Sequence, residues 1–438
     1  MRIHASFAAL LASLPLAASA QGPSYTAQFL GAANHIDAMN ESGLVVGWVS
    51  QGNARAFVAG PNHPYELLPL PAGMVSSYAD DINDAGVIVG AVGPSYAPEY
   101  YLQGRAAKWA PDGAGGWTIE VLGVLPGHVA SRAMAINNVG DIVGFSANGM
   151  FRFPVLFPAG GPVDLSSTGI FDPCDVNDQR VVVDQSSTAK KLNLNTMAVE
   201  DLGIPAGSYR ATRAEAINDD GIVVGAAILA TSTSCDRQAA RHGDDGWEIL
   251  SICGSNNSAY DINALGDVIM RLNLAVWVDL TGQGTHRVED LIVTATGHWS
   301  VINSYGNAIN DSRQIAVMAT HSTNGQSGAL LLTPEGASGV ATRLPDGTSL
   351  DVSVAPNPFD VATTLRLELV RAGHAKVALH DVTGRRVAIL FEGIRSAGPL
   401  SLRWDGRDAS ARELPNGVYF ARIETEAGAG NVRVVKLR

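Results

Sequence analysis

The chain has 438 residues, a formal net charge of −12 and 47 glycines, and only 6% of its residues are aromatic. The acidity is concentrated in residues 1–350, which carry 17 basic and 32 acidic side chains, whereas residues 351–438 carry 13 and 10. An acidic chain of this kind argues against nucleic acid and anionic membranes as partners, and the lack of a long 3.6-residue apolar period argues against a helical fold.

The first 20 residues have the pattern of a secretory signal peptide. Arg2 and His4 precede the apolar stretch 7–17, and small residues follow, so we expect cleavage between Ala20 and Gln21. The apolar stretch is shorter than the roughly 20 residues that a membrane helix needs, and no later segment approaches that length. The sequence therefore predicts an exported protein without a membrane span.

A twelve-residue unit, ADDINDAGVIVG at 79–90, returns at 133–144 and 214–225, and four weaker copies surround these. Each copy reads as a strand, an Asn-x-x-Gly turn and a second apolar strand. We expect the asparagine to bond the backbone two residues on and the glycine to take a positive φ. The turn residues are Asn40, Asn83, Asn137, Asn177, Asn218, Asn263 and Asn310, with Gly43, Gly86, Gly140, Gly221 and Gly266.

Two copies depart from this pattern. Arg180 and Arg313 stand where the turn glycine is expected, and Asp184 and Val317 stand where the unit ends in glycine in four other copies. We expect these two copies to keep their strands and to change their turns.

The motif asparagines lie about 45 residues apart, which is the period of a four-stranded propeller blade. Seven copies predict an all-β protein with a seven-bladed β-propeller in residues 21–334. The last copy lacks a closing strand, and the spare segment Ser24 to Leu30 is predicted to supply it. The core is predicted to contain Ile82, Ile136, Ile217, Ile262 and Ile309, together with Val89, Val143 and Val224.

The unit, followed by a strand that ends near tryptophan and then by a Leu-Gly strand, resembles the HAF-type repeats of bacterial extracellular proteins. That resemblance covers roughly residues 24–334. It implies an extracellular repeat protein and brings no catalytic residues.

Residues 335–350 are rich in Gly, Pro, Ser and Thr and are predicted to be a linker. Seven short alternating segments follow in residues 351–438, which predicts a small Ig-like β-sandwich. This tail resembles the type A sorting domain of type IX secretion, which is itself similar to the Ig-like domain of hook-capping proteins. The residues that carry the resemblance are Pro356, Asn357, Pro358, Gly384, Arg385, Trp404, Gly417, Tyr419 and Lys436.

The sorting resemblance implies that the outer-membrane secretion machinery is a partner, that the tail is removed within the linker, and that the protein reaches the medium or the cell surface of a Gram-negative bacterium. A permanent Ig-like domain is the alternative.

Of the three cysteines, Cys235 and Cys253 flank a hairpin whose tip is Gly243 to Gly246, and both lie nine residues from Asp244. We expect a disulfide between them, worth about 3 kcal/mol in the chain-entropy model. Cys174 is left over and is predicted to be a small buried side chain.

No catalytic motif stands out. The chain has no zinc pattern, no Gly-x-Ser-x-Gly elbow and no phosphate loop. Asp81-x-Asn83-x-Ala85-Gly86 matches part of a calcium loop, but the third ligand and the bidentate glutamate are missing, so the turn interpretation is preferred. We expect no catalytic residues, metal or cofactor, and a non-catalytic binding or adhesion function toward an unknown extracellular ligand. The alternative is a secreted hydrolase or lyase acting on a polymer.

Overall fold

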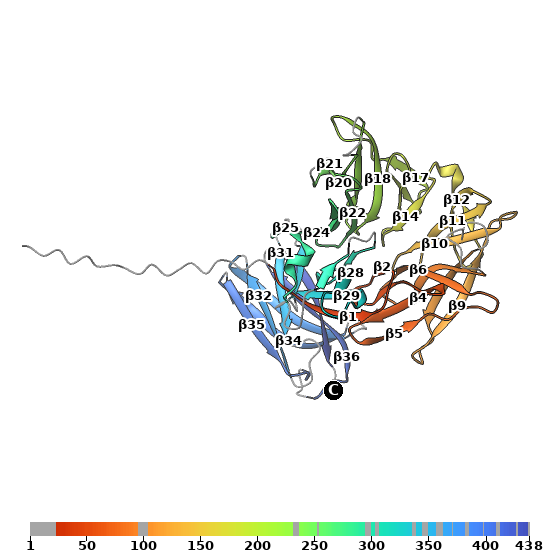
Figure 1. Ribbon diagram of the computed structural model, residues 1–438. Helices are drawn as coiled ribbons and strands as arrows, with labels where there is room; N and C mark the ends of the chain where they lie inside the picture. Colours follow the sequence, from red (N-terminus) through yellow and green to blue (C-terminus); the bar gives the residue numbers. More distant parts are fainter. Residues whose placement is uncertain are drawn as a thin grey trace, which may run out of the picture.

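The computed structural model describes residues 23–94, 104–230, 236–251, 254–293, 299–302, 306–334, 339–343, 349–355, 362–369, 371–381, 385–396, 398–408, 412–425 and 428–436. Ala20, Gln21, Cys235, Cys253, Pro356, Asn357, Pro358 and Gly384 lie outside these ranges. The regular secondary structure of the described chain is almost entirely β-strand, arranged as eight four-stranded antiparallel sheets and one five-stranded sheet. It is an all-β, propeller-like fold (Figure 1).

Seven sheets are formed by residues 25–334, and we call them together the ring. Six follow chain order with four strands each. Their strands are β2 (His35–Met39), β3 (Val45–Gln51), β4 (Asn53–Gly60) and β5 (His63–Leu67); β6 (Ser76–Ile82), β7 (Ile88–Gly93), β8 (Arg105–Pro111) and β9 (Trp117–Gly123); β10 (Ala130–Ile136), β11 (Ile142–Asn148), β12 (Phe151–Leu156) and β13 (Val163–Asp164); β14 (Pro173–Val176), β15 (Val181–Asp184), β16 (Lys190–Asn193) and β17 (Ala198–Asp201); β18 (Tyr209–Ile217), β19 (Val223–Leu229), β20 (Arg237–Gly243) and β21 (Gly246–Ile249); β22 (Ser258–Ile262), β23 (Val268–Leu272), β24 (Ala275–Leu280) and β25 (Gly284–Arg287).

The seventh sheet contains β1 (Tyr25–Gly31), β26 (Trp299–Val301), β27 (Ala308–Ile309), β28 (Ile315–His321) and β29 (Ser327–Pro334). Two short helical segments, η1 (Ser166–Thr168) and α2 (Val288–Leu291), lie in connections.

The seventh sheet is completed by the beginning of the chain, as expected. Strand β1 pairs antiparallel with β29 from Tyr25 opposite Pro334 to Phe29 opposite Leu330. Strands about 300 residues apart in sequence are thereby joined in one sheet, which ties the first part of the ring to the last.

The hairpin units fold as their apolar pattern predicts. Every residue of β7 is buried, and the five isoleucines at the ends of the first strands are only 4–6% exposed. Val89, Val143 and Val224 have no exposed surface. The core lies between neighbouring sheets: one cluster joins Val46 and Val58 of one sheet to Ile88 and Trp109 of the next. Burying each such side chain stabilises the fold by about 1.5–3 kcal/mol, so each sheet depends on its neighbours.

Residues 339–436 form two further four-stranded sheets. One contains β30 (Gly339–Arg343), β31 (Ser349–Ala355), β32 (Thr363–Leu369) and β35 (Gly398–Trp404). The other contains β33 (Gly373–Asp381), β34 (Arg386–Arg395), β36 (Gly417–Thr425) and β37 (Gly428–Lys436). A single apolar cluster draws on both sheets, with Val354, Leu365, Val377 and Ile423 among its members.

The prediction that residues 335–350 contain no strand is wrong. Strand β30 occupies residues 339–343 and pairs with β31 from Gly339 opposite Ser353 to Arg343 opposite Ser349. Its sequence, GVATR, is short and contains a glycine and a threonine, so its composition resembles a linker. Pairing with β31 and contact with β37 stabilise it.

Candidate functional site

The seven motif asparagines form one closed circle. Each of them follows the first strand of its repeat. The side-chain amide of each donates to the backbone carbonyl of the asparagine in the next sheet, over 2.8–3.3 Å. The circle closes because Asn310 Nδ2 donates to the Asn40 carbonyl, 270 residues away in sequence. All seven side chains are at most 7% exposed.

The side-chain oxygen of each asparagine stabilises its own turn. Asn83 Oδ1 accepts from the Val87 amide at 2.9 Å, and the corresponding bond to the residue four positions on occurs in all seven copies. The bond two residues on, which the sequence predicted, is present at Asn40, to the Ser42 amide. Asparagine is needed here because one side chain must donate across sheets and accept within its turn, and aspartate could not donate.

The two copies with arginine keep the same turn, so the prediction of a changed turn is wrong. Arg180 and Arg313 take φ values of 65° and 56°, and their amides bond the carbonyls of Asn177 and Asn310 as the glycines do elsewhere. Each guanidinium binds an aspartate of the preceding sheet: Arg180 Nε lies 2.7 Å from Asp141, and Arg313 Nε lies 2.8 Å from Asp267. These ion pairs offset the cost of a left-handed conformation in a residue with a Cβ.

A second circle follows the asparagines, formed by the next residue in each copy. The backbone amide of one member donates to the side-chain oxygen of the next, for example from Glu41 to Asp84 at 2.9 Å and from Asp311 to Glu41 at 2.9 Å. The members are Glu41, Asp84, Asn138, Asp178, Asp219, Ala264 and Asp311, and Ala264 has no oxygen to receive the Asp219 amide. We call this set the acidic rim; it borders a cavity of about 240 Å³.

Burial, followed by the nearby charge of Asp311, raises the pKa of Glu41 to about 8. The pKa values of Asp219 and Asp311 are also raised, first by burial and, for both, by neighbouring carboxylates as well. Three of the rim's carboxyl groups, Glu41, Asp219 and Asp311, therefore ionise less readily than in water.

Three more carboxylates lie deeper in the ring, two residues before the asparagine, where aspartate alternates with alanine around the circle. Asp81, Asp175 and Asp261 each accept the amide of the isoleucine in the next sheet, at 2.7–2.9 Å, as well as an amide of their own strand. Burial raises their pKa values to about 8, 6 and 7 respectively. Each aspartate joins two sheets.

This arrangement explains the partial likeness to a calcium loop. Both oxygens of Asp81 and the oxygen of Asn83 are occupied by backbone amides, so they are not directed at a cation. In the described part of the chain, no group of three or more His, Cys, Asp or Glu side chains is arranged to hold a metal ion.

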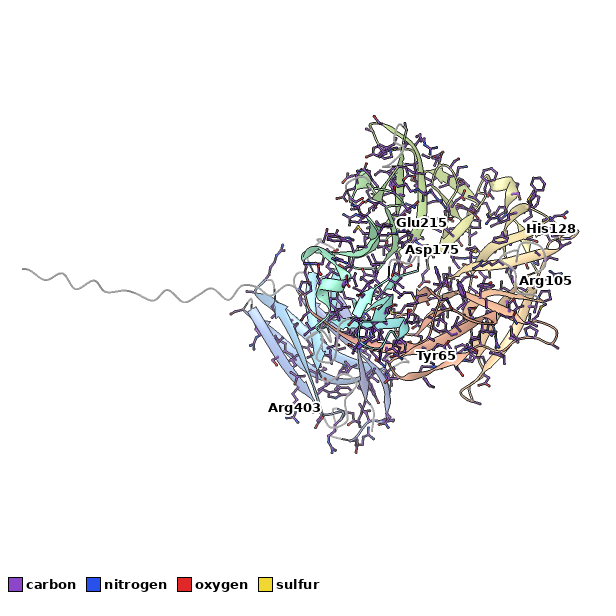
Figure 2. All side chains as sticks on the ribbon, viewed as in Figure 1. Tyr65, Arg105, His128, Asp175, Glu215 and Arg403 are labelled. Atoms are coloured by element: carbon purple, nitrogen blue, oxygen red, sulfur yellow. The ribbon has the colours of Figure 1, made fainter. Side chains whose placement is uncertain are left out.

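In the first strand of each repeat, the residues farther from the turn differ from copy to copy. Six of these strands carry a β-bulge at the position three residues before the asparagine, which is occupied by Asp37, Asp80, Met134, Cys174, Glu215 and Tyr260. A bulge adds an unpaired residue, re-aims its side chain and is common beside functional sites. Glu215, one of these bulged residues, is labelled in Figure 2 on the inner side of the ring.

Three neighbouring sheets bring charged and aromatic groups together here, and we call this the inner cluster. His35 Nδ1 lies 3.1 Å from Asp37 Oδ1, and Arg132 binds both oxygens of Asp80. The Arg132 guanidinium lies 5.5 Å from the centre of the Tyr78 ring. Trp48 is 5.7 Å from Tyr78 and 6.4 Å from His35, between ring centres.

The pKa values of an acid and a base in the inner cluster differ from their usual values. Asp37, by its charge and its hydrogen bond, raises the pKa of His35 despite the opposing effect of burial. Burial raises the pKa of Asp80. Further around the ring, burial raises the pKa of Glu215 to about 7, and that side chain is held by Gln185. Sequence analysis missed these residues because they share no motif; only their fixed distance from the motif asparagines could have indicated them.

The described residues of the sorting motif meet in one corner of the C-terminal sheets. Trp404 packs edge-on against Tyr419 at 5.2 Å, and the Tyr419 hydroxyl donates to the Pro415 carbonyl at 2.7 Å. Lys436 is 2% exposed, donates to the Leu414 carbonyl at 2.7 Å and passes over Gly406, where a Cβ would lie 2.7 Å from Lys436 Cε. These residues support one another structurally; Arg385 instead pairs with Asp381 at the surface.

Cys174, the remaining cysteine, is half-buried in β14 and its Sγ lies near the carbonyls of Val183 and Ala214. Burial raises the pKa of its thiol, which disfavours the reactive thiolate. Among the helices of the described residues, none is long and apolar enough to cross a membrane.

No family model and no curated protein matches this sequence. Solved structures with similar folds include PorZ, a surface component of the type IX secretion system of Porphyromonas gingivalis, with 13% identity over 92% of this chain and 65% of that one and a TM-score of 0.33. An oligogalacturonate lyase from Vibrio parahaemolyticus shares 9% identity over 72% of this chain and 98% of its own, with a TM-score of 0.44. The extracellular domain of a hybrid two-component protein from B. thetaiotaomicron shares 10% identity over 94% and 57%, with a TM-score of 0.41. At these values we draw no functional argument from them.

Proposed function

We propose that the protein is an exported, seven-bladed β-propeller binding protein whose ligand site is the inner cluster, followed by an Ig-like sorting domain of the type IX kind. The observation that supports the binding site is the meeting of Trp48, Tyr78, His35 and Arg132 from three consecutive sheets. Aromatic faces beside a small number of fixed polar groups are the usual lining of a ligand site. The invariant positions of the repeat, by contrast, are occupied in holding the sheets together.

Seven blades are supported by the seven sheets of the ring and by the closed circle of asparagines, and a ring leaves no exposed end for stacking. HAF-type repeats would place such a ring outside the cell, consistent with the signal-peptide pattern of residues 1–20.

Binding is tested with the mature chain on an array of extracellular polysaccharides and proteins. Arg132→Lys keeps the charge but loses the paired contact with Asp80 and the flat guanidinium over Tyr78. We expect it to weaken binding about tenfold, which corresponds to about 1.4 kcal/mol. Arg152→Lys, which lies over Phe145 outside the inner cluster, is the matched control and should leave affinity unchanged. Equal affinity in both variants would rule out the inner cluster as the binding site.

A secreted hydrolase or lyase is the second candidate, and one observation favours it. His35 is paired with Asp37 next to Asp80, so a candidate proton-transferring pair faces the aromatic side chains. The same array ligands are incubated with the protein at pH 5–8 and the products are separated by size. His128, which contacts Ser146 and Phe153 rather than the inner cluster, is the control. Cleavage that is lost in His35→Gln but retained in His128→Gln would show that the site is catalytic.

Export is tested separately. Truncation after Leu350 removes most of the C-terminal sheets, and we expect the truncated chain to remain in the periplasm while the full chain reaches the surface or the medium. Normal export of the truncated chain would identify the C-terminal part as a permanent Ig-like domain, and an intact C-terminal Arg438 on the exported form would rule out cleavage.

A further inference from the structure

A groove lies between the first two sheets of the ring, on the side of the turns and away from the inner cluster. It has a volume of about 380 Å³ and is bordered by Trp117, His63, Pro111, Ser42 and Ala85 and by the glycines of the β8–β9 hairpin. This volume is at the lower end of the range of about 300–1,000 Å³ found for small-molecule sites.

One wall of the groove is Trp117, whose ring is fixed by packing and by a hydrogen bond. Trp117 packs against the core cluster around Trp109, and its Nε1 donates to Glu66 Oε1 at 2.6 Å. His63 Nε2 lies 3.3 Å from the same Glu66 oxygen, and the His63 and Trp117 rings are 6.3 Å apart. One carboxylate therefore orients both rings that border the groove.

The part of the lining formed by the hairpin before Trp117 carries almost no side chains. The hairpin 112–116 is fixed by Asp112, whose Oδ1 accepts the amides of Ala114 and Gly116 at 2.7 and 2.8 Å. Gly113 and Gly115 have φ values of 76° and 93°, and a Cβ added at either glycine would meet no atom within 4 Å. A flat ring can consequently approach the indole without meeting side chains from this wall.

The charge of the groove selects among flat ligands. Among the described residues its lining contains Asp84 and no lysine or arginine, and Glu66 contacts the two rings, Trp117 and His63, that border it. A uronic acid, phosphate or sulfate would meet negative charge without a cationic partner. Hydroxyl groups, which both donate and accept, suit Ser42 and Asp84, which border the groove.

From these contacts we propose that the groove is a binding subsite for a neutral sugar ring, with one face of the sugar on Trp117 and its hydroxyls toward the acidic turns. Such a subsite lies apart from the inner cluster and would hold a neutral glycan at the edge of the ring. It is independent of whether the inner cluster binds or cleaves its own ligand.

The mature chain is titrated with neutral oligosaccharides (gluco-, xylo-, manno- and N-acetylglucosamine oligomers) and with oligogalacturonate, followed by calorimetry and tryptophan fluorescence. At least one neutral series should bind and change the fluorescence, and oligogalacturonate should bind at least tenfold more weakly at this site. Ala85→Arg fills the groove from an exposed turn position, so folding should be unaffected, and it should lower affinity at least tenfold. Trp117→Ala should do the same.

Trp247→Phe is the matched control, because Trp247 lies in the fourth strand of another sheet and donates to the Leu202 carbonyl without bordering the groove. It should leave affinity unchanged. The proposal is overturned if no neutral series binds, if oligogalacturonate binds better, or if Ala85→Arg binds as the unmodified chain does. Neutral-glycan binding that is lost in Arg132→Lys but not in Ala85→Arg would overturn this site while supporting the inner cluster.

Discussion

The first strand of every repeat has two ends that differ. The end at the turn is similar in all copies, whereas the other end varies from copy to copy. At the turn end all seven copies have asparagine, and every asparagine makes the same two bonds, one within its turn and one to the next sheet. Three residues earlier, the bulged positions hold aspartate, methionine, cysteine, glutamate and tyrosine. The uniform end holds the sheets together, and the varied end contains residues of the proposed ligand site.

The bulge explains how one strand can serve both purposes. An extra residue is left out of the pairing, so its side chain is re-aimed while the strand on either side keeps its register. A glycine in the paired strand leaves space for the bulge. A Cβ at Gly90 would lie 2.0 Å from the Tyr78 carbonyl oxygen, and a Cβ at Gly144 or Gly225 would be about as close to the carbonyl of the equivalent residue. Variation at the bulge therefore leaves the asparagine circle undisturbed.

The largest effect is expected from breaking the circle of asparagines. Asn137→Asp keeps the size of the side chain but removes the donor to the Asn177 carbonyl and places a carboxylate beside Asp141. A buried unpaired charge costs more than the 1–3 kcal/mol of a lost neutral partner, so we expect a loss of more than about 3 kcal/mol in urea unfolding. Asn148→Asp, at an exposed strand end of the same sheet, is the control, and equal stability of the two variants would refute the cohesive role.

The buried acids predict a dependence of stability on pH. Burial raises the folded-state pKa values of Asp81, Asp175 and Asp261 above the unfolded value of about 3.9, so the protonated forms favour the folded state. Their contribution is complete below about pH 4 and is lost as pH rises through about 6 to 8. Glu41 and Glu215 act in the same direction.

Melting temperature is measured from pH 4 to 9. We expect it to fall between pH 5 and 8, and the fall to be smaller in Asp81→Asn, which removes the acid with a pKa of about 8. A melting temperature that rises over this interval would show that the three aspartates are ionised in the folded ring.

Replacing the arginine of a turn should change the stability of the protein less. In Arg180→Gly the left-handed conformation is relieved, but the contact with Asp141 is lost, so the net change should lie within about 1 kcal/mol. In a double-mutant cycle with Asp141→Ala, we expect a coupling of about 0.5–1 kcal/mol. No coupling would mean that the ion pair does not compensate the missing glycine.

The smallest effect concerns the gap in the acidic rim. Ala264→Asn supplies an oxygen to the Asp219 amide, as Asn138 does for Asp84, without adding charge. We expect a gain of about 0.5–1 kcal/mol, measured by thermal unfolding. Ala264→Val, which adds volume without an acceptor, should give no gain; a gain as large in that variant would attribute the effect to packing.

The local pattern of this chain was sufficient to predict its strands and turns, because alternation and the Asn-x-x-Gly signal act over a few residues. It predicted the buried isoleucines and the pairing of the first strand with the last sheet, since an unfinished repeat and a spare strand are both visible in one dimension. It failed at β30, whose stability comes from its partner strand, and at Arg180 and Arg313, whose turns depend on an aspartate 39 or 46 residues away.

Only the tertiary structure decided which side chains share the inner side of the ring. His35 and Arg132 lie five residues before the motif asparagine of their copies and Asp80 lies three residues before its own, but no local rule links them, because their contact depends on how neighbouring sheets stack. The double role of the motif asparagine was hidden for the same reason. A turn needs an acceptor, which sequence can show, whereas a donor is needed only when the next sheet places a carbonyl within about 3 Å.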